Sequence, residues 1–271
     1  MARPDASWEA ELEKVVGKYI DIVREGLEER WKSIATELYE PEPHEVIGSL
    51  LARQATLTIQ LAGAPQIWNG HIAPLILRCM TDAHITLAWI LKDPINRAKR
   101  YILYGLGQEK LYIEHLKAEK TSGEESEVDQ IIQIREHWLN DQRHDGLTEV
   151  DVGSWSGMNT REMAEEAGCK SLYNYAYLPF SGVVHNMWQH VAIYNLKQCR
   201  NPLHKFHRAP TIAEAPLHPD FVYQSSKYVS RSFKVVDEKF ALSCKVPYPV
   251  DWLFNELEKL SGTLGDEKKA E

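Results

Sequence analysis

The segment 71–91, with the sequence HIAPLILRCMTDAHITLAWIL, is the most apolar stretch of the chain and decides the fold class. Its apolar residues fall on most sides of a helix, and Arg78, Asp82 and His84 interrupt them. No stretch of the sequence reaches the roughly 18 apolar residues that a membrane-spanning helix requires. The pattern therefore predicts a helix over 72–91 that is buried inside a helical protein, and no membrane partner.

Apolar residues at three- and four-residue spacing continue on both sides of this segment, which is typical of amphipathic helices. Further helices are predicted over 7–39, 45–61, 94–120, 128–139, 160–168, 170–199, 220–242 and 250–260. Pro41 and Pro43 are expected to end the first of them, and Pro179 and Gly182 to kink or split the helix over 170–199. Residues 121–127, 144–158 and 201–219 are predicted to be irregular connections. No segment shows the alternation of a strand, so we expect an all-α, single-domain helical bundle of about seven to nine helices.

The composition is that of an ordinary globular protein, with 44% hydrophobic and 26% charged residues among 271. No linker divides the chain, so one domain is expected over 1–262, with a disordered tail over 263–271. The first eight residues lack an apolar run, and the four cysteines show no paired spacing, which favours a cytoplasmic protein with free thiols. The net charge of -8 argues against a surface that coats nucleic acid generally, but local basic patches remain open.

Arg78 and Asp82 lie one turn apart on the helix predicted over 72–91. An isolated buried charge is very costly, so we expect both side chains in the interior, in contact with each other or with a shared partner. Two interpretations remain open. The pair is a structural ion pair that fixes helix packing, or Arg78 offers its guanidinium to a phosphate or carboxylate ligand.

Arg97, Tyr101 and Tyr104 share one side of the helix predicted over 94–120. Gly105 beside Tyr104 would permit a ligand or a neighbouring helix to approach closely. The stripe is either an amphipathic boundary face or a set of ligand-binding residues.

His185 follows the predicted helix break at Pro179 and Gly182. Disrupted backbone next to a titratable group is common in active sites, which makes His185 the preferred catalytic histidine over a structural role. His185 and His190 lie about 140° apart around a helix, so they cannot chelate one metal ion. A metal-dependent hydrolase would have to use Asp82, His84, His144 or His185. Because these residues lack a chelating spacing, no metal and no cofactor is expected.

The segment 197–208, KQCRNPLHKFHR, gathers four cations around His204 and His207 in an otherwise acidic chain. It is the segment best suited to attract phosphate. The alternative is a solvated helix end whose cations complement the helix dipole. The fingerprints of common hydrolases and nucleotide-binding loops are absent from the sequence.

Three pieces of sequence carry a resemblance to a known family. They are LR-x-x-x-D at 77–82 running into KDP-x-x-RA-x-x-Y at 92–101, WSG at 155–157 with REMA-x-x-AG at 161–168, and LY at 172–173 with S-x-x-VH at 181–185. In order and spacing they resemble the bacterial domain-of-unknown-function family 5677 over about 45–208. The chain has Asp82 where the family commonly has glutamate, which keeps a carboxylate but shortens its reach. The resemblance implies a helical domain without an assigned activity.

A more distant likeness is to the HEPN helical domains, many of which are RNA-cleaving toxins or defence proteins. They use an arginine followed by a histidine at a short spacing, which Arg78 with His84 and Arg200 with His207 approximate. Pro202 would break a helix that carried the second pair.

The sequence therefore predicts a polar site between the helices over 72–91, 94–120 and 170–199. In this hypothesis Arg78 holds the anion of a phosphate-containing ligand, a nucleotide or RNA, and Asp82 orients Arg78 or His185. His185 then acts as general acid or base. The chain is also a candidate for forming a homodimer. The competing hypothesis is a non-catalytic protein whose polar core is structural and whose exposed helix face binds a partner.

Overall fold

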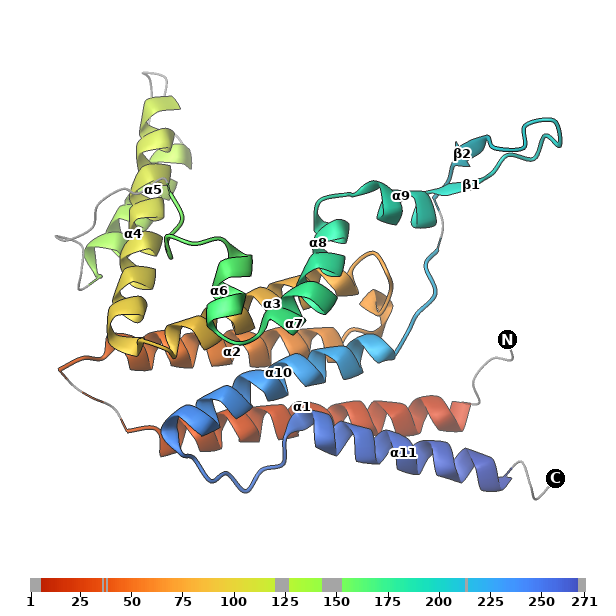
Figure 1. Ribbon diagram of the computed structural model, residues 1–271, viewed down its shortest axis with the longest axis horizontal. Helices are drawn as coiled ribbons and strands as arrows, with labels where there is room; N and C mark the ends of the chain where they lie inside the picture. Colours follow the sequence, from red (N-terminus) through yellow and green to blue (C-terminus); the bar gives the residue numbers. More distant parts are fainter. Residues whose placement is uncertain are drawn as a thin grey trace.

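The computed structural model describes residues 6–35, 37, 39–119, 127–142, 153–212 and 214–267. Its long helices are α1 (Ala6–Ser33), α2 (Glu42–Ala62), α3 (Ala73–Ile90), α4 (Pro94–Glu119), α5 (Glu127–Asn140), α10 (Asp220–Phe240) and α11 (Pro249–Glu267). Shorter elements are η1 (Pro65–Ile67), α6 (Thr160–Glu166), α7 (Lys170–Leu172), η3 (Tyr173–Tyr177), α8 (Leu178–Val184), α9 (Trp188–Tyr194), β1 (Leu196–Gln198) and β2 (Arg208–Pro210). The predicted all-α fold is confirmed, and the strands of the described residues form a single two-stranded ribbon (Figure 1).

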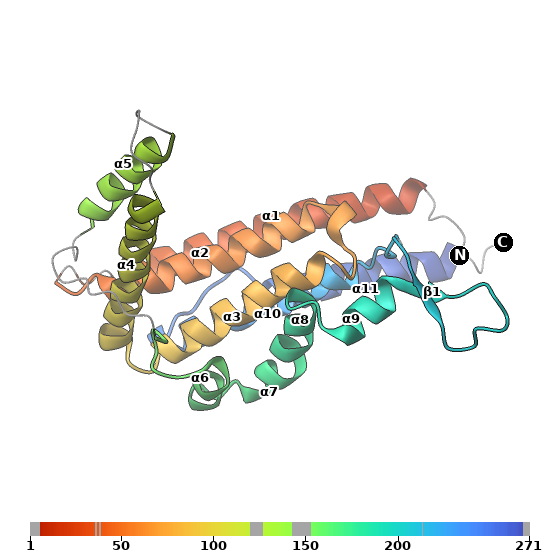
Figure 2. The same ribbon diagram turned by 90° about the horizontal axis from the view of Figure 1, so that it is seen from above.

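Helix α3 is the buried helix that the sequence predicts, and it packs against α2, α10 and the segment from α6 to α8. Helix α10 also contacts α2 and α11, while α1 runs beside α2 and α11 (Figures 1 and 2). The facing sides form one apolar core in which Leu51, Leu77, Leu87 and Phe233 are fully buried. No helix among the described residues is both long and apolar enough to cross a membrane.

Helices α4 and α5 form a hairpin that stands away from one end of the long bundle (Figures 1 and 2). It has a small apolar cluster of its own, made of Leu106, Ile113, Ile132 and Leu139. The base of α4 packs on α2, so the hairpin is attached to the bundle mainly through that helix.

Several helix ends differ from the prediction. Helix α1 ends at Ser33 rather than at residue 39, and α2 begins at Glu42 with Pro43 inside its first turn. Proline is tolerated there because the first turn of a helix needs no intrahelical donor. Helix α11 extends to Glu267, beyond the predicted helix end at residue 260, because no proline stops it there. The connection over 121–126, most of the predicted loop over 144–158, and the last residues lie outside the described residues.

The backbone accommodates Pro179 without the predicted split at that point. A proline in a regular α-helix clashes with the carbonyl four residues earlier. The five residues of η3 form a π-helix, a wider turn, directly before Pro179, which then lies in the first turn of α8. The helical run therefore continues to Val184 and breaks at 185–187, where Asn186 adopts a positive φ of 51°.

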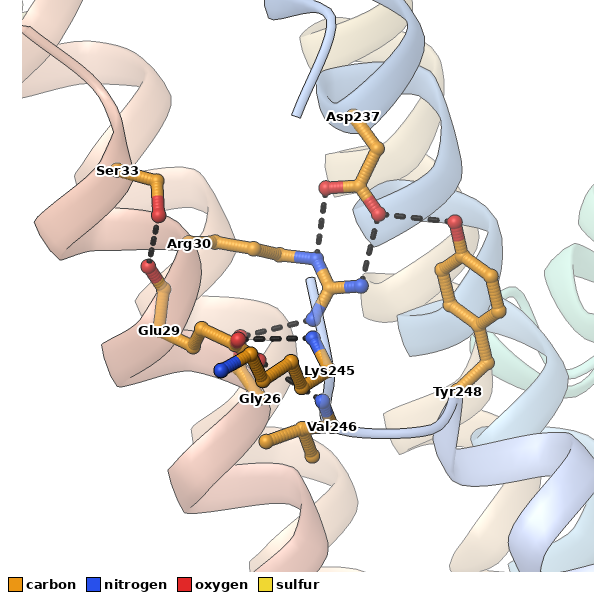
Figure 3. Close-up of polar contacts among 8 residues, drawn as sticks. All are labelled: Gly26, Glu29, Arg30, Ser33, Asp237, Lys245, Val246 and Tyr248. Atoms are coloured by element: carbon orange, nitrogen blue, oxygen red, sulfur yellow. Dashed lines mark hydrogen bonds and ion pairs between the residues drawn. The ribbon is translucent and has the colours of Figure 1, made fainter. Parts of the chain in front are cut away.

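A buried polar network ties α1 to the C-terminal helices (Figure 3). Arg30, only 1% exposed, donates through Nε and Nη2 to both carboxylate oxygens of Asp237 on α10, at 2.9 and 2.7 Å. The Tyr248 hydroxyl donates to the same carboxylate, and Arg30 Nη1 donates to the Gly26 carbonyl. Sequence spacing cannot reveal this pair, because its partners are 207 residues apart.

Candidate functional site

Arg78 projects from α3 toward the segment that runs from η3 into α8. Its guanidinium carbon lies 3.4 Å from the centroid of the Tyr177 ring, and its Nε donates to Ser181 Oγ at 2.8 Å. The Ser181 hydroxyl in turn donates to the Tyr177 carbonyl. Stacking on one face and a bond at Nε fix the plane of the guanidinium, which leaves its terminal nitrogens to meet Asp82 or a ligand.

Asp82 contacts Arg78 as predicted, with Oδ1 3.5 Å from Nη1. The side chain of Arg78 is 15% exposed, but that of Asp82 is 49% exposed, so the predicted interior position of Asp82 is wrong. The residues of η3 and α8 cover Arg78, whereas the carboxylate one turn further along α3 stays accessible. Desolvation by the surrounding protein nevertheless raises the pKa of Asp82, and Arg78 opposes this shift.

Tyr101 and Tyr104 line a cleft of about 830 Å³ between α2, α4 and α5. Its walls carry four aromatic rings, two side-chain amides and two carboxylates. The polar and aromatic lining consists of Glu45, Ser49, Tyr101, Tyr104, Gln108, Trp138, Asp141, Gln142 and Trp155. This volume lies in the range of small-molecule sites.

Tyr101 senses the charge of Asp82 from the wall of this cleft. Its ring packs edge-on against Trp155 with centroids 5.0 Å apart. Burial raises the pKa of the Tyr101 hydroxyl, and the negative charge of Asp82 raises it further. Tyr101 therefore lies in the cleft wall and within the electrostatic field of Asp82.

Arg97 belongs to neither the cleft nor the Arg78–Asp82 pair. Its guanidinium stacks on Trp89, with its central carbon 3.8 Å from the ring centroid, and donates to the Trp89 carbonyl and to Glu166 on α6. The Trp89 indole donates to the same carboxylate at 2.7 Å. The hydrogen bonds from Arg97 and Trp89 lower the pKa of Glu166. These contacts hold α6 on α3 and direct Arg97 away from the cleft.

His185 is exposed at the C-terminal end of α8, so the prediction that it shares an internal pocket with Arg78 is wrong. The break in the backbone falls at 185–187, after the part of α8 that covers α3, and His185 therefore points away from the packed side. Ser181, one helical turn earlier, occupies the position beside Arg78. Neither Ser181 nor Tyr177 was identified from the sequence, although their four-residue spacing places both on one face of a helix.

The candidate ligands of the metal-dependent hydrolase hypothesis do not form a site in the part of the chain that the structure describes. His84 is buried against Ser232 of α10, and its pKa falls to about 4 because burial disfavours the charged ring. His185 is exposed at the C-terminal end of α8, and His144 lies outside the described residues. In the described part of the chain, no group of three ligand atoms gathers around Asp82.

The burial of His84 also separates it from Arg78, which faces α8. Arg200 and His207 lie in the connection between β1 and β2 and not on a helix. Neither pair therefore has the shared helix face that the HEPN likeness would require.

Comparisons with known proteins give one result. The family of unknown function DUF5677 matches residues 44–200, close to the span of the resemblance seen in the sequence. No curated protein and no solved structure was found to match the chain. The matched segment contains α2 to α9 and therefore both parts of the site, while α1, α10 and α11 lie outside it. Because the match covers more than half of the 271 residues, the chain belongs to the DUF5677 family.

Proposed function

We propose that the protein binds a nucleotide or single-stranded RNA, with a base in the aromatic cleft and a phosphate at Arg78. Two observations carry this proposal, namely the fixed guanidinium of Arg78 and a cleft lined by four aromatic rings, one of which, Tyr101, is affected by the charge of Asp82. Aromatic rings stack on any base, and side-chain amides and carboxylates can bond to its edge. A guanidinium held by its Nε presents its terminal N–H groups to phosphate oxygens.

The segment around the ribbon favours RNA over a mononucleotide. Residues 187–212 contain Lys197, Arg200, Lys205 and Arg208 and no carboxylate. Phe206 in the same segment is 97% exposed and offers a stacking surface. Cations combined with exposed aromatic rings are typical of proteins that hold single strands.

Calorimetric titration of the full chain tests the proposal with matched ligands. A nucleoside probes the cleft alone, and the corresponding nucleoside triphosphate probes both parts. We expect Arg78→Gln to weaken triphosphate binding by at least about tenfold, the scale of one charged hydrogen bond, and to leave nucleoside binding unchanged. Arg161→Gln removes an exposed arginine of α6 and serves as the control. Absence of binding of the nucleotide and of a short single-stranded RNA would sink the proposal.

Replacing Asp82 tests the proposal through a change of affinity opposite to that expected for Arg78→Gln. Its carboxylate competes with a bound phosphate for the terminal nitrogens of Arg78. Asp82→Asn should therefore tighten triphosphate binding several-fold, whereas a purely structural ion pair predicts lower stability and no change in affinity. A carboxylate with a raised pKa is also the group that we assign to proton transfer. If the wild-type chain cleaves RNA, Asp82→Asn should bind the RNA without cleaving it.

Partner binding is a second candidate function, and exposed apolar side chains around the ribbon favour it. They are Met187, Trp188, Ile193, Leu203, Phe206 and Ile212. This segment is basic while the whole chain carries -8, so a second copy of the chain has the complementary charge. Light scattering after size exclusion should then show a dimer that Trp188→Ser with Phe206→Ser converts to monomer. A monomeric wild-type chain excludes this candidate.

A further inference from the structure

Strands β1 and β2 form a short antiparallel ribbon that extends away from the helical bundle (Figures 1 and 2). The nine residues between them, 199–207, fold back so that the Cys199 amide donates to the His207 carbonyl at 3.0 Å. Two further turn bonds, from His204 to Asn201 and from His207 to His204, order the backbone of this connection. The turn thereby brings the side chains of Cys199, His204 and His207 close together.

The three side chains present ligand atoms to one another. The Cys199 sulfur and one ring nitrogen of each histidine all lie within 4.8 Å of one another. The Cys199 Sγ to His204 Nδ1 distance is 3.7 Å, and the side-chain amide of Asn201 lies beside the other ring nitrogen of His204. A tetrahedral zinc ion with ordinary bond lengths separates a sulfur and a nitrogen ligand by roughly 3.6 Å.

We propose that Cys199, His204 and His207 form a Zn²⁺ site at the end of this ribbon. A thiolate with two imidazoles is a ligand set that zinc prefers over the hard cations Mg²⁺ and Ca²⁺. Binding releases the thiol proton to solvent, and the sulfur and two ring nitrogens each donate a lone pair to the metal. Three protein ligands leave the fourth position open for water or for a ligand atom from a bound partner. The inference is independent of the nucleotide site.

The packing of the ribbon supplies a second, independent reason. Its connection buries almost no apolar surface, since Leu203 is 86% and Phe206 97% exposed. Two three-residue strands without a core do not hold a fixed shape in water. Small segments of this kind are commonly stabilised by a metal ion or a disulfide. Cys199 forms no disulfide and is the one cysteine in the group of ligand atoms found among the described residues, which favours a metal ion.

A thiol–imidazole hydrogen bond is the competing explanation for the 3.7 Å contact. It accounts for Cys199 and His204 but gives no role to His207. Metal binding needs all three residues, so the dependence on His207 separates the two explanations.

The test uses the full chain, reduced and freed of metal with a chelator, and Co²⁺ as a spectroscopic probe for the site. We expect one equivalent of Co²⁺ to give a thiolate-to-cobalt charge-transfer band and the visible bands of a tetrahedral ion, and Zn²⁺ to displace it. Cys199→Ser should abolish the charge-transfer band. His204→Ala and His207→Ala should each weaken Zn²⁺ binding by at least about 100-fold, because even loss of an outer partner costs up to that much.

Cys79→Ser and His137→Ala are the matched controls, since both residues are exposed and lie on helices away from the ribbon. They should leave Zn²⁺ affinity unchanged. Alkylation mapped by mass spectrometry provides a second readout, in which Zn²⁺ slows the reaction of Cys199 but not that of Cys79. Failure to bind Co²⁺ or Zn²⁺, an unaltered His207→Ala variant, or equal alkylation of Cys199 with and without Zn²⁺ would overturn the proposal.

Discussion

Two arginines illustrate how the surroundings of a guanidinium decide its role. Arg30 donates to both oxygens of Asp237 and to the Gly26 carbonyl, and its side chain is sealed from solvent. Arg78 is fixed by stacking and by its Nε, but its contact with Asp82 is a single one of 3.5 Å to a half-exposed carboxylate. The first arginine is committed to the fold, whereas the second retains the capacity to bind an anion.

Replacing Arg30 should destabilise the protein strongly. Arg30→Met leaves the carboxylate of Asp237 buried without its ion-pair partner, which costs about 3–5 kcal/mol in the free energy of unfolding. Arg24→Met, at an exposed position of the same helix, should change it by less than about 0.5 kcal/mol. Urea unfolding measures both values. A loss below about 1 kcal/mol for Arg30→Met would contradict the structural role assigned to the pair.

His84 should make stability depend on pH. Its pKa falls from 6.5 to about 4 in the folded protein because burial disfavours the charged ring. Between pH 6.5 and pH 4 the unfolded chain binds the proton and the folded chain does not. The contribution of neutral His84 to the free energy of unfolding is therefore complete above pH 6.5 and is lost as the pH falls toward 4. The loss has a slope of at most about 1.4 kcal/mol per pH unit, and about 3 kcal/mol in all.

His84→Asn should remove this part of the slope, since asparagine can still bond to Ser232 but does not titrate. Unfolding free energies at several pH values between 7 and 4 measure the difference from wild type, which cancels the contribution of other groups. His137→Asn, at an exposed position, is the control. Equal slopes for wild type and His84→Asn would show that His84 is accessible to protons in the folded state.

At the residue level, the sequence predicts the contact between Arg78 and Asp82 because four-residue spacing on a helix brings the side chains together. It could not predict which turn of α8 faces Arg78. That depends on the π-helix before Pro179, which shifts the facing residue to Ser181 and leaves His185 exposed. The proximity of His207 to Cys199 could not be predicted either, because it depends on how the turn of the ribbon folds.

At the element level, the long helices could be predicted from apolar spacing, because each buries one face against the bundle. Their ends could not, since capping and loop packing decide them. The ribbon was missed because strands of three residues are too short to show an alternating pattern. The sequence predicts only an irregular segment over 201–219 and a cationic stretch over 197–208 that attracts phosphate or ends a helix.

The α4–α5 hairpin should open independently of the bundle. Helix α5 packs mainly on α4 through the small cluster that contains Ile132. Ile132→Ala should therefore speed hydrogen exchange in α5 by local opening, while the exchange of α10 stays unchanged. Phe233→Ala in the main core should instead lower the global unfolding free energy by about 3–5 kcal/mol. Equal effects of both variants on α10 would show that the hairpin and the bundle are one cooperative unit.

At the scale of the whole molecule, the matched segment 44–200 does not contain the whole core. Helix α10 packs on α2 and α3 and supplies Val229 and Phe233, which are fully buried. Helices α1 and α11 cover the other side of this layer, and Arg30 joins α1 to α10 (Figure 3). On the basis of these contacts, we propose that residues 1–262 form one domain.

The segment 44–200 should consequently fail to fold cooperatively when it is produced alone. Without α10, apolar faces of α2 and α3 become exposed, which should give dye binding and a weak near-ultraviolet circular dichroism signal. Residues 6–267 should unfold in one transition for the main bundle. A sharp transition and native-like dichroism for 44–200 would show that the core is complete without α10.

The most direct test of the proposed function is a crystal structure of the full chain with the nucleotide that binds most tightly in the calorimetric series. The account predicts a phosphate oxygen within about 3 Å of a terminal nitrogen of Arg78. It also predicts the base stacked in the cleft that Tyr101 and Tyr104 line. A nucleotide bound elsewhere, with Arg78 still paired only to Asp82 and Ser181, would contradict it.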